Sequence, residues 1–237
     1  MIDLFSRLRL LIGKEQLKTI QSKRILVFGL GGVGGNVCDA LVRSGIEDIS
    51  IVDNDIINVT NINRQLIANY NTVGKKKVDV MEEHLKSLNP NVKVTKFDCF
   101  YLPDNSEQFD FSKYDYVIDA IDTVSAKIDI IFKCKTQHVR VISALGCGNK
   151  MDPTKLEVSD IYKTEYDPLA RVLRRELKKR CIDSLKVVYS KEKPLPLIEE
   201  EKEEKNNKKE IPGSTAFVPP VAGIIIASEV IKDLLDK

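Results

Sequence analysis

One stretch of the sequence decides the fold: Ile25-Leu26-Val27-Phe28-Gly29-Leu30-Gly31-Gly32-Val33-Gly34-Gly35. Its first four residues are apolar and predict a fully buried strand. Gly29, Gly31 and Gly34 then follow the G-x-G-x-x-G pattern at the turn into a helix predicted over residues 36–44. Glycine suits this turn because a Cβ atom would keep a phosphate away from the backbone, while the free N–H groups of the helix N-terminus attract an anion. The stretch therefore predicts a nucleotide-binding strand, turn and helix.

A second predicted strand, over residues 49–52, ends at Asp53, about 20 residues after Gly34. An acidic residue at this distance holds a ribose hydroxyl in dinucleotide-binding folds. A glycine-rich turn without a ligand is the alternative, and the flanking strand, helix and acid together favour nucleotide binding over it. These residues do not choose between a dinucleotide and ATP.

Strand and helix patterns alternate along residues 1–150. An alternating pattern predicts a strand over 92–97, and short apolar runs predict strands over 116–120, which is buried, and 140–144. Helices are predicted over 75–88 and 125–137. Residues 2–20 predict two short helices separated at Gly13. The alternation predicts an α/β fold, a Rossmann-like doubly wound and mostly parallel sheet with helices on both faces.

The pattern changes after residue 150. It predicts an extended strand over 156–161, a strongly basic helix over 168–180 and a short strand over 185–189. The charged stretch near 191–212 predicts a mobile surface loop, and the apolar run 216–227 a strand that leads into a buried helix. We expect one domain over residues 1–237, with an ATP-binding part over 1–150 and a substrate-side extension over 151–237.

Composition excludes several classes of protein. Of the 237 residues, 43% are hydrophobic and 30% charged, with a net charge of +2, so overall charge says little about partners. The five cysteines form no C-x-x-C pair, which favours a reducing, cytoplasmic compartment and argues against disulfides and a structural zinc site. No signal peptide is visible. The apolar run near the C-terminus is too short and interrupted for a stable membrane span, although it leaves peripheral membrane association open.

Three further charged features could contact a phosphate or its metal ion. Arg64, in Asn61-Ile62-Asn63-Arg64-Gln65, is either a surface residue or a planar clamp on a triphosphate. The lysines of Gly74-Lys75-Lys76-Lys77 oppose the helix dipole, which is unfavourable unless a phosphate lies opposite; a solvated face is the alternative. Asp122 follows a predicted central strand, where it could hold Mg²⁺ or cap the next helix.

Together these motifs resemble the superfamily of ubiquitin-activating-like and sulfur-carrier adenylyltransferases, which includes the ThiF, MoeB and HesA proteins. The resemblance covers the glycine stretch, Val52-Asp53-Asn54-Asp55, the Asn-Arg stretch, Gly74-Lys75-Lys76-Lys77 and Asp119-Ala120-Ile121-Asp122. Beyond residue 150 the chain looks like the branch of tRNA threonylcarbamoyladenosine dehydratases, in Asp152-Pro153-Thr154, Asp167-Pro168-Leu169-Ala170-Arg171 and Phe217-Val218-Pro219-Pro220. The resemblance thus spans nearly the whole chain.

The resemblance implies a role for each matching residue. Asp122 would hold Mg²⁺, and Arg7, with Arg9 as a second candidate, would reach the phosphates of the partner subunit in a homodimer. Arg7, Arg64, Lys77 and Asp122 would be the catalytic residues. ATP would be bound by Gly29, Gly31, Gly32, Gly34, Asp53, Asp55, Asn61, Arg64 and Lys77.

The implied activity is ATP-dependent dehydration, by cyclisation, of threonylcarbamoyladenosine in tRNA, through adenylation of its threonyl carboxylate. The alternatives are adenylation of the C-terminus of a ubiquitin-like sulfur-carrier protein, an NAD-dependent oxidoreductase and a non-catalytic nucleotide-sensing module. The superfamily also raises a sulfur-relay protein as a partner, while Cys181 fits an ordinary thiol. The basic helix is a candidate tRNA contact or a solvated basic face; its candidate residues are Arg171, Arg174, Arg175, Lys178 and Lys179.

Overall fold

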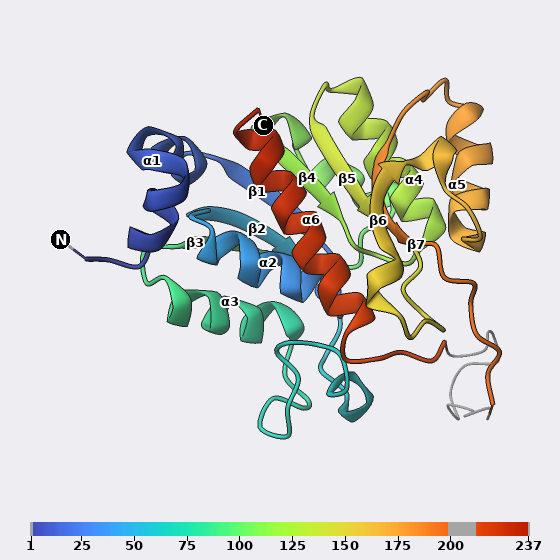
Figure 1. The fold of residues 1–237 in the computed structure, drawn as a ribbon, viewed down its shortest axis with the longest axis horizontal. Helices are drawn as coiled ribbons and strands as arrows, with labels where there is room; N and C mark the ends of the chain where they lie inside the picture. The colour runs from blue at the N-terminus through green and yellow to red at the C-terminus, as the bar shows by residue number, and fades with distance from the viewer. Residues whose placement is uncertain (1, 199–211, 237) are drawn as a thin grey trace.

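The computed structural model describes residues 2–198 and 212–236. Its centre is a seven-stranded sheet in the order β3-β2-β1-β4-β5-β7-β6, in which only β6 runs antiparallel to its neighbour (Figure 1). The predicted doubly wound, mostly parallel α/β fold is confirmed. The strands are β1 Arg24–Phe28, β2 Asp48–Val52, β3 Lys93–Phe97, β4 Tyr116–Asp119, β5 Arg140–Ala144, β6 Leu156–Asp160 and β7 Lys186–Ser190.

Six α-helices surround the sheet in the described part of the chain. They are α1 Ser6–Gln21, α2 Gly34–Arg43, α3 Lys77–Leu88, α4 Val124–Thr136, α5 Pro168–Lys178 and α6 Val218–Leu234. Five short 3₁₀ turns join them: η1 Val59–Asn61, η2 Pro103–Gln108, η3 Phe111–Lys113, η4 Pro153–Lys155 and η5 Ile161–Lys163. Helix α1 bends at Gly13, whose φ of +81° is not helical, so the predicted break is confirmed.

Two hydrophobic layers form because the central strands are apolar on both faces. Helices α2, α3 and α6 cover one face, and Figure 1 shows α6 crossing in front of the sheet. Helices α4 and α5 and an aromatic cluster around Phe28 cover the other. This burial on both sides explains the unbroken apolar runs of β1 and β4.

The apolar run near the C-terminus was predicted to begin as a strand, and this prediction is wrong. The run enters α6 directly at Val218, and its two prolines occupy the first helical turn, where a missing N–H is harmless. Gly223 lets α6 approach α2 closely, since a Cβ there would lie 2.4 Å from the carbonyl oxygen of Val33. Most apolar side chains of α6 are therefore buried in the protein. Among residues 2–198 and 212–236, no helix combines the length and apolar character needed to cross a bilayer.

The segment after residue 150 adds two strands to the same sheet. Strand β7 pairs in parallel with β5, and β6 closes the edge antiparallel to β7. The antiparallel edge was not predicted. Most of the charged stretch predicted as a mobile loop near 191–212 lies outside the described residues.

Candidate functional site

A cavity of about 330 Å³ opens at the carboxyl ends of β1 and β4. These neighbouring strands lie where the strand order reverses, the place at which open α/β sheets bind ligands. Nearly all the predicted nucleotide-binding residues line it: Gly29, Gly31, Gly32, Asp53, Asp55, Asn61, Arg64, Lys77 and Asp122. Gly34 lies beneath the turn and Arg7 elsewhere, so neither is part of the lining.

The glycines of the turn have different tasks. Gly29 has a φ of +88°, and a Cβ there would lie 2.7 Å from the carbonyl oxygen of Ala120. A Cβ on Gly34 would collide with the Gly29 carbonyl oxygen, so glycine is needed for α2 to start directly under the strand. A Cβ on Gly31 would meet no atom of the described residues within 4 Å. Gly31, which lines the cavity, is therefore the glycine that leaves open space for a ligand.

Asp53 forms hydrogen bonds with the backbone of the cavity wall. Its side chain is 8% exposed, and its carboxylate accepts hydrogen bonds from the N–H groups of Leu30 at 2.7 Å and Asp55 at 2.8 Å. Burial raises the pKa of this carboxyl, while the Lys77 ammonium, 3.8 Å away, opposes the shift. Asp53 thus ties the end of β2 to the glycine turn, and its contact with ribose stays a prediction.

The lysines 75–77 separate clearly in the structure. Lys77 is 5% exposed, lines the cavity and lies 2.6 Å from a carboxylate oxygen of Asp55. Lys76 is exposed and pairs instead with Asp98, and Lys75 is exposed. Of the three, only Lys77 fits the phosphate role. Its ion pairs with Asp53 and Asp55 give this buried ammonium counter-ions.

Arg64 presents a cation to the cavity without a carboxylate partner. The half-buried guanidinium donates to the carbonyl oxygen of Thr60 and to Oδ1 of Asn63, both at 2.9 Å. Neither acceptor is charged, and Arg64 makes no ion pair within the described residues. Burial lowers the pKa of the guanidinium. A phosphate would supply the missing negative charge.

Asp122 faces the same cavity from the loop after β4. The alternative role as a helix cap is wrong, because Thr123 occupies the N-cap position of α4 and the helix has no side-chain cap. Within residues 2–198 and 212–236 the exposed Asp122 carboxylate makes only a 3.5 Å contact with Thr123 Oγ1, which leaves it able to hold a hard cation. Residues 2–198 and 212–236 contain no group of three or more acidic, histidine or cysteine ligands, so further oxygens would have to come from water and phosphate.

A buried ion pair behind Asp122 was missed in the sequence. Lys127 and Asp119 are both fully buried, with Nζ 2.9 Å from the carboxylate. Lys127 also donates to the carbonyl oxygen of Ile121 at 2.9 Å, and the Ser143 hydroxyl donates to Asp119. The available signal was a lysine among the apolar, core-facing residues of α4. This pair fixes the loop that carries Asp122.

The basic helix α5 presents less free charge than its sequence suggests. Arg174 turns inward and donates to the carbonyl oxygen of Thr164 at 3.1 Å. Glu176 forms ion pairs with Arg175, Lys179 and Arg180. These contacts, of which that with Lys179 has the largest effect, lower the pKa of its carboxyl to about 2. Of the five predicted tRNA-binding residues, Arg171 and Lys178 are exposed and make no ion pair in the described part of the chain.

Arg7 is exposed on α1 and does not line the cavity of its own chain. Arg9, the second candidate, already pairs with Asp3 at 2.8 Å. The five cysteines are free, and Cys181 is exposed.

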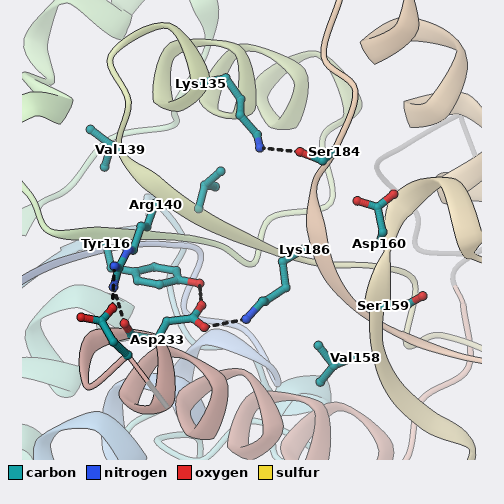
Figure 2. A pocket seen from close by; sticks show the side chains of 12 residues that line it. Tyr116, Lys135, Val139, Arg140, Val158, Ser159, Asp160, Ser184, Lys186 and Asp233 are labelled. Atoms are coloured by element: carbon teal, nitrogen blue, oxygen red, sulfur yellow. Dashed lines mark hydrogen bonds and ion pairs between the residues drawn. The ribbon is translucent and has the colours of Figure 1, made fainter.

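A larger cavity, of about 600 Å³, lies at the opposite, amino-terminal edge of the sheet. Figure 2 shows several of its polar groups in contact with one another: the Tyr116 hydroxyl donates to Asp233, Lys186 pairs with Asp233, and Arg140 contacts the end of α6. Ligands of such sheets bind at the carboxyl ends of the strands. The smaller cavity, with its unpaired arginine, is therefore the candidate site.

Comparison with known proteins matches residues 5–237 to the ThiF family. A curated relative from Bacillus subtilis, named tRNA threonylcarbamoyladenosine dehydratase, is 42% identical over 243 residues, which span 99% of this chain and 96% of that protein. A relative of the same name from Escherichia coli is 42% identical over 168 residues, 71% of this chain and 63% of that protein. A solved structure of the E. coli tRNA N6-threonylcarbamoyladenosine dehydratase TcdA in complex with ATP is 33% identical, with a TM-score of 0.87, covering 98% of this chain and 93% of that one.

Proposed function

The chain belongs to the ThiF family, and on this premise we propose that it is an enzyme that uses ATP to dehydrate threonylcarbamoyladenosine in tRNA. The single observation that carries the proposal is the cavity at the ends of β1 and β4, where the unpaired Arg64, the buried Lys77 and the exposed Asp122 face one space. The near full-length similarity to dehydratases supports the same substrate.

The cavity can seat a triphosphate. The open face of Gly31 admits a phosphate to the backbone at the N-terminus of α2, where N–H groups and the helix dipole favour an anion. Arg64 and Lys77 then neutralise phosphate charge from two other sides. An approaching phosphate would also compete with Asp55 for Lys77, because that ion pair is half open to solvent on the Asp55 side.

The chemistry proceeds in two displacements. A threonyl carboxylate oxygen attacks the α-phosphorus of ATP, and pyrophosphate leaves. A nitrogen or oxygen of the carbamoyl group then attacks the activated carbonyl carbon, AMP leaves with the former carboxylate oxygen, and the carbamoyl group loses one N–H proton to solvent. The sum is ring closure with loss of one water. The protein needs no covalent intermediate; it positions the groups and stabilises the charge that builds on the phosphates.

Asp122 fits the role of a Mg²⁺ ligand, since its carboxylate is exposed on the cavity and free of a capping bond. The ion would supply charge neutralisation to the phosphate oxygens.

A homodimer with Arg7 acting in trans accounts for the position of this arginine. Arg7 shares one face of α1 with Leu10 and Leu11, because residues three and four apart on a helix are neighbours. The two leucines are 86% and 83% exposed. A second copy that covers them would bring Arg7 to an interface.

The tRNA role of α5 narrows to its unpaired cations. Arg171 and Lys178 are the residues whose charge is available to RNA phosphates, while Arg174, Arg175 and Lys179 contribute less because they already have partners. A sulfur-relay partner is an implication of the family alone, and a cytoplasmic location rests on the absence of paired cysteines in the sequence. No contact among the described residues favours a carrier protein as the acceptor.

The test is mass analysis of tRNA nucleosides after incubation with the protein, ATP and Mg²⁺. We expect the modified adenosine to become lighter by one water, with one AMP and one pyrophosphate released per product. Unchanged nucleosides, together with pyrophosphate exchange stimulated by a small protein that ends in Gly-Gly, would instead establish the carrier-protein adenylyltransferase.

A mixing experiment tests the trans arrangement. Arg7→Ala and Asp122→Ala should each be inactive alone. If Arg7 acts across the dimer, mixed dimers regain one complete site and therefore part of the activity. Two inactive variants that stay inactive after subunit exchange would show that Arg7 does not act across the dimer, and an active Arg7→Ala variant would place Arg7 outside the reaction.

A further inference from the structure

Tyr166 has a backbone conformation that bulky residues rarely adopt, with a φ of +56°. Four other non-glycine residues of the described chain share this region of φ. His138, Cys181 and Asp236 follow the ends of α4, α5 and α6, where left-handed residues are common, and Asn149 is of a type that tolerates it. Tyr166 differs from all four, because it is a bulky aromatic residue that directly precedes the N-cap of a helix.

Buried neighbours on both sides impose this conformation. Thr164 is 6% exposed and accepts a hydrogen bond from the inward-turned Arg174. Asp167 is 5% exposed, caps α5 through the Ala170 N–H at 2.9 Å and accepts from the Gly146 N–H at 3.2 Å. The strain is maintained by fixed contacts, and such outliers gather at functional sites.

The ring of Tyr166 faces solvent at the reactive edge of the sheet. Tyr166 is 56% exposed. Its neighbour Asp167 contacts the loop after β5, and β5 lies beside β4, whose end leads to Asp122. Tyr166 is thus held at the same edge as the ATP cavity.

One cation contacts the ring, and another lies on the helix that follows it. Lys193 Nζ lies over one face of the ring, 5.0 Å from its centroid, which leaves the other face for a base. Arg171 is exposed in the first turn of α5, with no ion-pair partner among the described residues. An exposed aromatic ring among cations is the arrangement with which proteins bind single-stranded nucleic acid: the ring stacks on a base and the cations contact phosphates.

We propose that Tyr166 is a stacking platform for a base of the single-stranded tRNA loop that carries the modified adenosine, with Lys193 at the ring and Arg171 on the following helix available for the RNA backbone. The proposal rests on the proposed function and adds a residue that recognises the RNA. Rigid neighbours would keep the ring in place, so little conformational freedom is lost on binding.

A fluorescence experiment tests stacking directly, because the protein contains no tryptophan. Tyr166→Trp introduces a single indole at the site. Titration with tRNA that carries threonylcarbamoyladenosine should quench its emission in step with binding, as a stacked base does. An RNA duplex hairpin at the same phosphate concentration should quench it much less. Equal quenching by both RNAs, or none by either, would overturn the stacking proposal.

Affinity measurements separate the ring from the backbone. Tyr166→Gly removes the ring and suits the left-handed φ, whereas Tyr166→Phe keeps the aromatic face. We expect Tyr166→Gly to weaken tRNA binding roughly 5- to 100-fold and to leave the KM for ATP unchanged, with Tyr166→Phe close to wild type. The exposed Tyr70, as Tyr70→Ala, is a matched control that should retain tRNA affinity.

The outcomes distinguish failure of the Tyr166 proposal from failure of the proposed dehydratase function. If the wild-type protein converts the modified tRNA but Tyr166→Gly binds it within twofold of wild type, the platform is refuted and the function stands. If Tyr70→Ala loses as much affinity as Tyr166→Gly, the platform is also refuted. If the wild-type protein neither binds nor converts the tRNA, while an acidic or carrier protein stimulates pyrophosphate exchange, both proposals fail.

Discussion

Replacing Lys127 by methionine should destabilise the protein more than almost any other single side-chain change. Lys127 and Asp119 are both fully buried and 2.9 Å apart, so Lys127→Met would leave the Asp119 carboxylate without its cation in a dry interior. Removing one partner of a buried ion pair costs about 3–5 kcal/mol. The bond from Nζ to the Ile121 carbonyl oxygen is lost as well. Against a total stability of about 5–15 kcal/mol, this is a large fraction.

The assay is urea unfolding followed by circular dichroism, since no tryptophan is available. Single variants Lys127→Met and Asp119→Asn are compared with the double variant. In the double variant neither charge remains, so we expect it to recover most of the loss. Lys127→Arg retains the cation and should cost less than Lys127→Met, although guanidinium geometry differs from that of an ammonium.

The reasoning also predicts an effect on catalysis. The Lys127 bond to Ile121 holds the loop that carries Asp122, so folded Lys127→Met should release pyrophosphate more slowly, with partial rescue in Lys127→Arg. A cost below about 1 kcal/mol for Lys127→Met would refute the account, as would a double variant whose loss equals the sum of the two single losses.

Three further predictions concern the same site, and a fourth concerns a cysteine outside it. Asp122→Asn should lower the rate of ATP-dependent pyrophosphate release about 100- to 1,000-fold at saturating Mg²⁺. Its unfolding by urea should stay nearly unchanged, because the side chain is exposed. A fall in rate of less than tenfold would argue against a role in phosphate chemistry. Lys77→Met should raise the KM for ATP at least tenfold while the exposed Lys75→Met does not, which titration with ATP would measure; equal effects would remove the distinction between the two lysines. The same Lys77→Met variant should be less destabilised in mildly acidic solution than at pH 7.5. Burial already raises the pKa of the Asp53 carboxyl, and loss of the Lys77 cation raises this pKa further. Because a protonated carboxyl needs no counter-ion, the free energy of unfolding of the variant relative to wild type should fall as pH rises through that pKa. Cys181 should react first with a thiol reagent because it is exposed, and Cys181→Ser should keep tRNA turnover within twofold; a larger loss would give this thiol a role that its surroundings do not indicate.

Local signals carried most of the fold prediction. The apolar run before Gly29 and the glycine turn predicted β1, α2 and the nucleotide cavity, because buried parallel strands and phosphate turns each have a strong local signature. Arg64, Lys77 and Asp122 were predicted from motif position, and the topology brings all three to one cavity.

Long-range contacts explain what could not be predicted. The direction of β6 depends on its pairing with β7, some 30 residues further along the chain, and no local pattern encodes this. The apolar run before Ser228 was expected to begin as a strand, and it is instead helical from Val218, where α6 packs on α2. The neutralised charge of α5 was available in the sequence: Glu176 lies three and four residues before Lys179 and Arg180, the spacing of helical ion pairs.

The buried ion pairs lie at the same edge of the sheet as the nucleotide-binding motifs. Within the described residues, three ion pairs have both side chains less than a tenth exposed: Lys77 with Asp53, Lys127 with Asp119, and Lys150 with Asp167. Each one fixes the backbone just beyond the carboxyl end of a strand, namely β2, β4 and β5.

Apolar side chains of similar volume would stabilise such positions at least as well, so stability alone does not explain why charges are buried there. At the opposite edge, around the larger cavity, the ion pairs of Lys186 and Arg140 are partly exposed. Ion pairs and hydrogen bonds with all partners present fix the position of a loop more closely than apolar packing does. Adenylation needs accurately placed loops where phosphate, carboxylate and cations must meet. We therefore expect apolar replacement of the Lys127 and Asp119 pair to retain stability and lose catalysis, a separation that a purely structural pair would not show.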